Sequence, residues 1–148
     1  MYRHILIATD GSELANRAVL HGLALAKSVG AEATVLTVTA QWTASEMATR
    51  AELGEQHPVD DYERDAAAVA RRILDLVREQ AQILRVACET LHEPDSHPSE
   101  AILRIAEARD CDLIVVSTHA RQGLARIIIG SQAAEVIAAA KVPVLVCR

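Results

Sequence analysis

Two short segments carry groups that could bind an anionic ligand. Thr9-Asp10-Gly11-Ser12 follows an apolar run, and Gly130-Ser131 opens a helical stretch after a longer loop. A glycine followed by a hydroxyl residue at a helix start offers unhindered N–H groups, the positive end of the helix dipole and a side-chain donor. The segment 130–131 is therefore a phosphate-site candidate. Asp10 places a carboxylate at a strand end, and the alternative for Asp10 and Ser12 is that they only cap the next helix.

Several catalytic and metal-binding motifs are excluded by spacing. No Lys follows Gly130, and the interval from Gly123 to Gly130 is too long for a phosphate-binding loop of the Walker type. No G-x-G-x-x-G follows a strand and no G-x-S-x-G occurs, so a dedicated enzyme is not predicted. His92 and His97 are five apart with Pro94 between them, which favours a polar loop entering a helix at Pro98 over a zinc site.

Composition and charge exclude further classes of function. The chain has 148 residues, of which 51% are hydrophobic and 24% charged, and this is typical of one folded domain over residues 1–148. It carries 15 Lys and Arg against 20 Asp and Glu, a net charge of −5, which argues against nucleic acid as a partner. Tyr2, Trp42 and Tyr62 are the aromatic residues, too few for a base-stacking platform.

Cysteine usage and the start of the chain indicate a cytoplasmic protein. Cys88, Cys111 and Cys147 are an odd set without a C-x-x-C pair, which is typical of core thiols in a reducing compartment. No apolar run reaches the roughly 18 residues of a membrane span, and no basic segment precedes an apolar leader. We therefore expect no membrane partner.

Short apolar runs alternate with helical patterns along the whole chain. We expect strands at Ile5–Ala8, Val35–Val38, Arg85–Leu91, Leu113–Val116 and Val142–Val146, the third of them at a sheet edge. We expect helices with one apolar face along Ala15, Val19, Gly22, Ala26 and Val29 and along Tyr62, Ala66, Val69, Ile73 and Leu76, and two more over 100–108 and 131–140. This alternation predicts an α/β fold with a doubly wound, five-stranded parallel sheet and helices on both faces.

In such a sheet, ligands lie beyond the carboxyl ends of the strands where the winding reverses. The loops after the first and fourth strands therefore matter most. The connection over 39–61 is unusually long, and a short helix around Ser45–Leu53 is expected in it. A variable surface loop and a lid over the site both remain as interpretations of this segment.

Four segments together resemble the universal stress protein family. They are the opening 5–12, the run Asp112-Leu113-Ile114-Val115-Val116-Ser117-Thr118-His119, the segment 123–131 and the ending Val142-Pro143-Val144-Leu145-Val146. The resemblance spans the chain in the family's order. It implies a Rossmann-like, adenine nucleotide alpha hydrolase-like fold that binds an adenine nucleotide and forms a homodimer through the last strand.

Members of this family that bind ATP carry G-x2-G-x9-G-[ST] after the fourth strand. Here these positions fall on Ser117, Ala120, Gly130 and Ser131, so that the last two match and the first two do not. A methyl group at Ala120 costs roughly 1 kcal/mol if the backbone there is left-handed, which is about tenfold or less in affinity. The resemblance implies that these nucleotide-binding residues act together: Thr9, Asp10, Val38, Ser117, His119, Ala120, Gly130 and Ser131.

The resemblance leads us to expect ATP as the ligand, with or without Mg²⁺ or Mn²⁺, in the crevice between the loops after the first and fourth strands. The protein would then be a nucleotide-gated regulatory or protective module in a stress response, with a protein partner that the sequence does not name. The alternatives are a nucleotide-independent dimeric scaffold with a degenerate site and, more distantly, a weak ATPase. We expect a homodimer paired through Val142–Val146, because an unpaired apolar edge strand promotes aggregation.

Overall fold

A five-stranded parallel sheet in the order β3-β2-β1-β4-β5 organises the computed structural model, which describes residues 1–118 and 130–148. The chain runs through β1 (His4–Ala8), α1 (Glu13–Val29), β2 (Glu32–Thr39), α2 (Ala44–Glu52), α3 (Pro58–Leu84), β3 (Cys88–Pro94), α4 (Pro98–Ala108), β4 (Leu113–Ser117), α5 (Ser131–Ala139) and β5 (Val144–Cys147). The predicted fold class and the predicted edge position of the third strand are confirmed.

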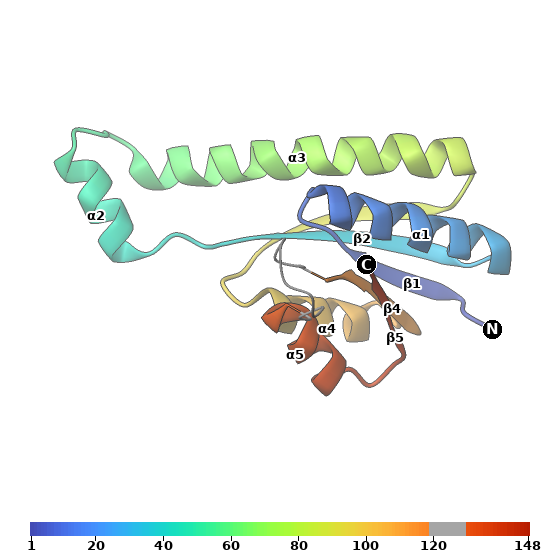
Figure 1. Ribbon diagram of the computed structural model, residues 1–148. Coiled ribbons are helices and arrows are strands. Elements are labelled where there is room, and N and C mark those ends of the chain that lie inside the picture. The colour runs from blue at the N-terminus through green and yellow to red at the C-terminus, as the bar shows by residue number, and fades with distance from the viewer. Residues whose placement is uncertain (119–129) are drawn as a thin grey trace.

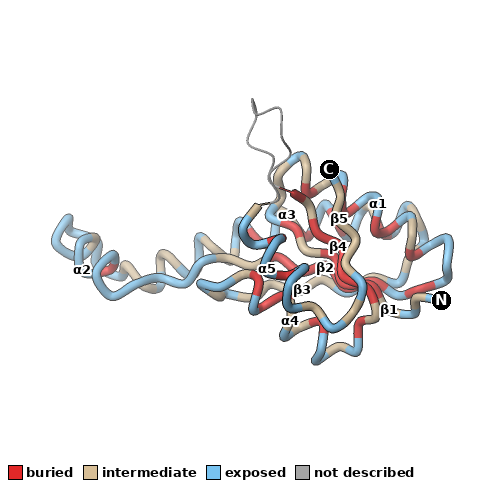
Figure 2. Tube along the Cα trace, turned by 60° about the horizontal axis from the view of Figure 1, so that its bottom comes forward, coloured by how far each residue is buried: buried red, intermediate tan, exposed pale blue. Residues whose placement is uncertain are grey.

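Helices cover both faces of the sheet. α1 and α3 lie on one face and α4 and α5 on the other (Figure 1). Side chains alternate between the two faces along a strand, so neighbouring residues belong to different hydrophobic clusters. Ile5 and Ile7 pack toward α1 and α3, while Leu6 packs toward α4. All three of these β1 side chains are fully buried, as Figure 2 shows for the central strands.

The winding reverses between β1 and β4. From β1 the chain winds outward through β2 to β3, and then returns to place β4 on the other side of β1 and β5 beyond it. α1, which follows β1, and α5, which follows β4, lie on opposite faces of the sheet, and a fold of this type forms a crevice at the carboxyl ends of these two strands. The predicted strand pattern thus locates the candidate site.

Two details of α3 correct the sequence analysis. Val69 and Leu76, expected on its apolar face, are 44% and 56% exposed, and the buried residues of the helix are Ala70, Leu74, Val77 and Ala81. The helix therefore has two rows of apolar residues. The row that packs toward the sheet is the one that begins and ends with alanine, Ala70 and Ala81.

The third strand begins later than predicted because α3 continues to Leu84. Arg85 closes the helix with a left-handed φ of 58°, so Arg85–Ala87 is the turn and the strand starts at Cys88. Helical periodicity alone does not fix where a helix ends.

The long connection contains the expected short helix, observed as α2. This helix and the start of α3 project beyond the carboxyl edge of the sheet (Figures 1 and 2). Met47 is the buried residue of α2. The Trp42 indole N–H donates to Glu63 Oε1 at 3.0 Å, and the Tyr62 hydroxyl donates to the Ala40 carbonyl at 2.9 Å. These bonds tie the connection to α3.

No helix within the described ranges 1–118 and 130–148 is long and apolar enough to cross a membrane. All three cysteines are described and free, with Cys111 buried and the other two half-buried. Burial raises the pKa of the Cys111 thiol to about 11, with a contribution from the Asp112 carboxylate. Cys111 is thus a core residue as predicted, whereas Cys88 and Cys147 are partly buried and pack against the core.

Candidate functional site

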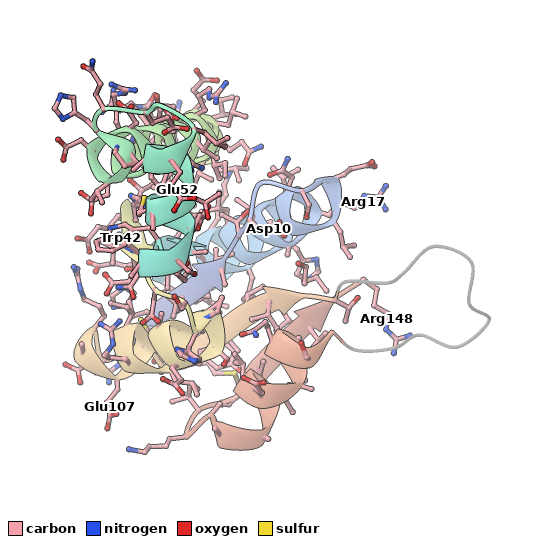
Figure 3. All side chains as sticks on the ribbon, turned by 90° about the vertical axis from the view of Figure 1, so that its left-hand side faces the viewer. Asp10, Arg17, Trp42, Glu52, Glu107 and Arg148 are labelled. Carbon is pink, nitrogen blue, oxygen red and sulfur yellow. The ribbon has the colours of Figure 1, made fainter. Side chains whose placement is uncertain are left out.

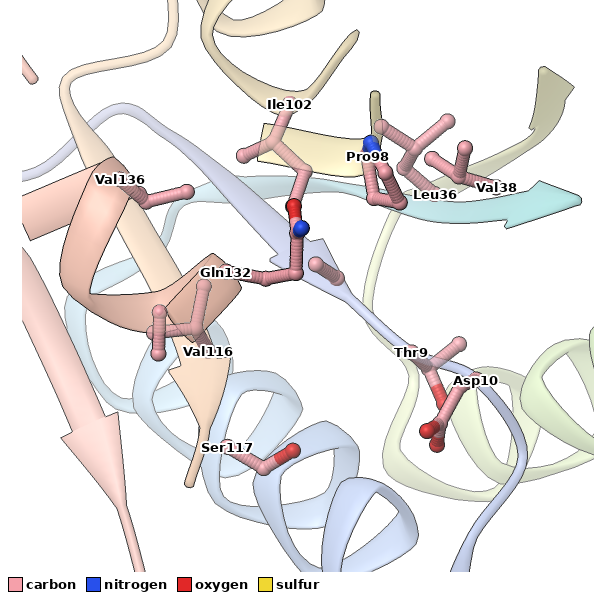
Figure 4. A pocket seen from close by; sticks show the side chains of 12 residues that line it. Thr9, Asp10, Leu36, Val38, Pro98, Ile102, Val116, Ser117, Gln132 and Val136 are labelled. Carbon is pink, nitrogen blue, oxygen red and sulfur yellow. The ribbon is translucent and has the colours of Figure 1, made fainter. Parts of the chain in front are cut away.

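A cavity of about 210 Å³ opens at the carboxyl ends of β1, β2 and β4, on the side of the sheet covered by α4 and α5 (Figure 4). Its wall is largely apolar on the sheet side and carries polar groups at the loop after β1, the end of β4 and the start of α5. The lining residues are Ala8, Thr9, Asp10, Leu36, Val38, Pro98, Ile102, Val116, Ser117, Gln132, Ala133 and Val136.

The loop after β1 is held by local hydrogen bonds. Asp10 Oδ1 accepts from the Ser12 N–H at 2.9 Å, and Ser12 Oγ accepts from the Ala15 N–H at 3.2 Å. Gly11 lies between them with φ of +78°, a conformation that suits glycine. Ser12 thus caps α1, whereas Asp10 turns the loop and also lines the cavity.

Thr9 is buried and fixes the backbone beside Asp10. Its hydroxyl accepts from the Gly11 N–H at 3.1 Å, and its carbonyl accepts from the Thr37 hydroxyl at 2.7 Å. In Figure 3, which looks onto the carboxyl edge of the sheet, Asp10 lies near the centre of this face. Figure 4 shows the Asp10 carboxylate and the Ser117 hydroxyl directed toward each other across the gap between β1 and β4.

The backbone of Val38 faces the cavity side of β2. The Leu36 carbonyl accepts from the Thr9 N–H at 2.9 Å, so the backbone groups of Leu36 point toward β1. Alternate residues of a strand in a parallel ladder face the same neighbour, which turns the N–H and carbonyl of Val38 to the same side. Since Ala8 pairs with Leu36 and ends β1, these groups of Val38 lie beyond the last residue of that strand.

The start of α5 forms the opposite wall. Gly130 is its N-cap residue and supplies no side-chain cap, and Gln132 and Ala133 from the first turn line the cavity. Gly130 and Ser131 precede them directly and are not among the lining residues. His119 and Ala120, which the resemblance implies as site residues, lie outside the described residues.

The structure brings four of the predicted residues to one cavity, namely Thr9, Asp10, Val38 and Ser117. Sequence reasoning missed its apolar wall, formed by Leu36, Pro98, Ile102, Val116 and Val136, and it missed Gln132. Leu36 shares a strand face with Val38, so the period of two could have identified it. Pro98 and Ile102 come from α4, whose approach to this edge depends on tertiary packing. Residues 39–61 contribute no lining side chain among the described residues.

The two histidines near Pro94 have separate roles. His92 Nε2 and Thr39 Oγ1 are 2.6 Å apart, and burial lowers the pKa of His92. His97 is the N-cap residue of α4, with Pro98 at its first turn as predicted, and its side chain is exposed. Within the described part of the chain, no three His, Cys, Asp or Glu residues are grouped so as to hold a metal ion.

Comparisons with known proteins add a family and a fold. The sequence model of the universal stress protein family matches residues 1–148. The universal stress protein YxiE of Bacillus subtilis is 29% identical over the whole of both chains. A universal stress protein of Thermus aquaticus, encoded beside a sulfhydrylase, is 33% identical over the whole of both chains.

Solved structures share the architecture. The protein MJ0577 superposes with a TM-score of 0.79 at 25% identity, covering 99% of this chain and 96% of the other. A universal stress protein in complex with cAMP superposes with a TM-score of 0.69 at 21% identity, covering 99% and 97%. One from Archaeoglobus fulgidus in complex with dAMP gives 0.60 at 19% identity, covering 99% and 98%. These neighbours share the fold of this chain, and the last two hold adenine nucleotides.

Proposed function

The chain belongs to the universal stress protein family, and from that premise we propose that it binds an adenine nucleotide, ATP, in the cavity between β1 and β4. The observation that carries the proposal is the position of the uncapped start of α5 across the cavity from Asp10. A helix start without a side-chain cap leaves N–H donors for phosphate, and a carboxylate accepts from ribose hydroxyls.

The adenine, the ribose and the phosphates would each contact a different part of the cavity. The adenine ring would lie against Leu36, Val38 and Ile102, with the backbone groups of Val38 at its polar edge. The ribose would lie between Asp10 and Ser117, and the phosphates at Gly130 and Ser131. Complexes of neighbours with cAMP and dAMP support adenine nucleotides as the ligand class.

We assign the protein a nucleotide-gated regulatory or protective role in a stress response. ATP, with Mg²⁺ or Mn²⁺ on its phosphates, would bridge the loop after β1 and the start of α5. A ligand shifts a protein toward the conformation that it binds more tightly. The surface that changes would then contact a protein partner. Slow hydrolysis of ATP would need a residue that positions a water molecule for attack. We propose no such role for any described residue that lines the cavity.

The test measures nucleotide directly. Freshly purified protein is denatured and its supernatant chromatographed, and the nucleotide-free protein is then titrated with ATP and Mg²⁺ in a calorimeter. Stoichiometric adenine nucleotide or micromolar binding is expected. If neither appears, the protein is a nucleotide-independent scaffold and the proposal is wrong.

Asp10→Asn tests the placement of the ribose. The amide oxygen still accepts from the Ser12 N–H and preserves the loop, but the charged acceptor is lost. We expect ATP affinity to fall about tenfold or more, since hydrogen bonds to charged groups contribute about 1.5–3 kcal/mol. Asp60→Asn, on the exposed first turn of α3, is the matched control. Equal affinities for both variants would contradict the placement.

We also propose that two copies pair through β5. This strand bonds to β4 along one edge, and its residues are only half-buried. Its second edge has no neighbouring strand among the described residues. Antiparallel pairing of two such edges about a twofold axis would satisfy both.

A further inference from the structure

The side chain of Gln132 lines the proposed nucleotide cavity, and although the residue is exposed, a hydrogen bond holds its amide in one orientation. Its Oε1 accepts from the Ser99 N–H at 2.9 Å, in the first turn of α4. The Ser99 hydroxyl in turn donates to Glu135 Oε2 at 2.5 Å. Ser99 is 3% exposed, so these two bonds join a buried residue of α4 to two exposed residues at the start of α5.

The same bond fixes which atom of the amide faces the cavity. A backbone N–H needs an acceptor, so the oxygen of Gln132 must face Ser99. The amide nitrogen then presents its two hydrogens elsewhere, and no hydrogen bond joins it to another described residue. Figure 4 shows the amide extending from α5 toward Ile102 on α4.

This nitrogen is a side-chain donor at the border of a cavity whose other wall residues are largely apolar. Leu36, Ile102 and Val136 line the same cavity, and none of them forms hydrogen bonds through its side chain. An apolar pocket with a few placed polar groups uses those groups to fix a ligand's orientation. The amide oxygen of Gln132 already accepts from Ser99, so only the amide nitrogen can bond to a ligand. This nitrogen favours a ligand with an acceptor at that position over a ligand with a donor there.

We propose that Gln132 reads the base: its amide nitrogen donates to a ring nitrogen of the bound purine. This inference rests on the proposed function and adds a specificity-determining side chain to it. The purine ring lies between Gln132 on α5 and the Val38 backbone on β2, which confines it from both sides. Nucleosides whose ring offers an acceptor at this position bind, and analogues with a carbon there bind more weakly.

The experiment compares ligands and variants in one cycle. Adenosine is used because it carries no phosphate, so that changes at the α5 start do not act through charge on phosphate. Wild-type protein, Gln132→Met and the control Gln82→Met, on the exposed surface of α3, are titrated with adenosine and with its 1-deaza, 3-deaza and 7-deaza analogues. Each analogue replaces one ring nitrogen with carbon.

We expect Gln132→Met to bind adenosine about tenfold more weakly than wild type, the effect of one hydrogen bond of about 1.4 kcal/mol. One deaza analogue should show the same loss with wild type and no further loss with the variant. Gln82→Met should match wild type throughout. Gln132→Glu keeps an acceptor for the Ser99 N–H and replaces the amide donor with a charged oxygen, which only accepts, so it should lose adenosine affinity even if Gln132→Met folds poorly.

The outcomes separate the two proposals. Wild type that binds adenosine while Gln132→Met and Gln132→Glu bind it equally well overturns the role of Gln132 and leaves the nucleotide site standing. A loss that is the same for adenosine and for all three analogues also overturns it. Wild type that binds neither ATP nor adenosine overturns both. A second readout is the side-chain amide signal of Gln132 in a ¹H–¹⁵N spectrum, which should move downfield on binding.

Discussion

At the scale of single residues, Asp112 connects two strands at the edge opposite the candidate site. Its carboxylate accepts from the N–H of Arg3 at 2.9 Å and of His4 at 3.1 Å, and its own N–H donates to the His4 carbonyl. Partial burial acts to raise the pKa of Asp112, but the N–H groups of His4 and Arg3 outweigh it, and the pKa is lowered. The ionised form is therefore favoured in the folded protein.

The lowered pKa of Asp112 predicts acid sensitivity. A group whose pKa is depressed by folding stabilises the protein above its unfolded pKa of about 3.9, and this stability is lost as pH falls through the folded pKa. Asp112→Asn should lower the free energy of unfolding at pH 7 by about 1 kcal/mol, since a neutral amide accepts less strongly. Urea unfolding at pH 7 and pH 3 measures both proteins.

The difference between the two proteins should shrink at pH 3. A difference that stays constant between the two pH values would show that the charge of Asp112 has no part in the stabilisation. Asp65→Asn, which is on the exposed side of α3, controls for a general effect of removing one negative charge.

At the scale of elements, α1 packs very closely on the sheet at Gly22. A Cβ built at this position would lie 2.6 Å from Ile7 Cδ1 and 2.9 Å from Ile7 Cγ1. Ile7 is fully buried in β1, so its side chain would have to shift among its buried neighbours to make room. The glycine thus sets the distance between α1 and β1, and with it the position of the loop that carries Asp10.

Gly22→Ala should therefore destabilise the protein even though alanine favours helices. Overpacking costs about 1–3 kcal/mol, against a helix-propensity gain of about 1 kcal/mol. Ile7→Val removes the Cδ1 atom that the new methyl group meets. The double variant should be more stable than the sum of the two single losses predicts, as measured by chemical denaturation. Strict additivity would show that the contact with Ile7 is not the cause.

At the scale of the whole molecule, the proposed homodimer depends on the edge of β5 that does not pair with β4. The Pro143 carbonyl accepts from the Ile114 N–H in β4, and the Cys147 carbonyl accepts from the Thr118 N–H directly after β4. The backbone groups of Val144 and Val146 therefore point to the other side. Proline at position 146 would remove an N–H from the outer edge and leave the bonds to β4 in place.

Val146→Pro should convert a dimer into a monomer, as measured by sedimentation at micromolar concentration. Val146→Ala keeps the N–H and should remain dimeric. Wild type that sediments as a monomer, or Val146→Pro that sediments as a dimer, would contradict pairing through β5.

Much of the candidate site could be predicted because strand ends in a parallel sheet lie together. Asp10 follows from its place at the end of an apolar strand, Thr9, Val38 and Ser117 follow from the family resemblance, and all four line the cavity. Gln132 could not be predicted, because an exposed position in a helical first turn looks the same in sequence whichever way its side chain points. Its orientation depends on Ser99, which is 33 residues earlier in the chain.

The sequence by itself determined the order of strands and helices, the doubly wound class and the segments that meet at the switch point. These follow from local periodicity and from the geometric rules of parallel sheets, which need no knowledge of partners. Tertiary structure alone decided which apolar stripe of α3 is buried, where β3 begins and that Gln132 bonds to Ser99. Each of these depends on competition between contacts that are distant in sequence, and only packing decides that competition.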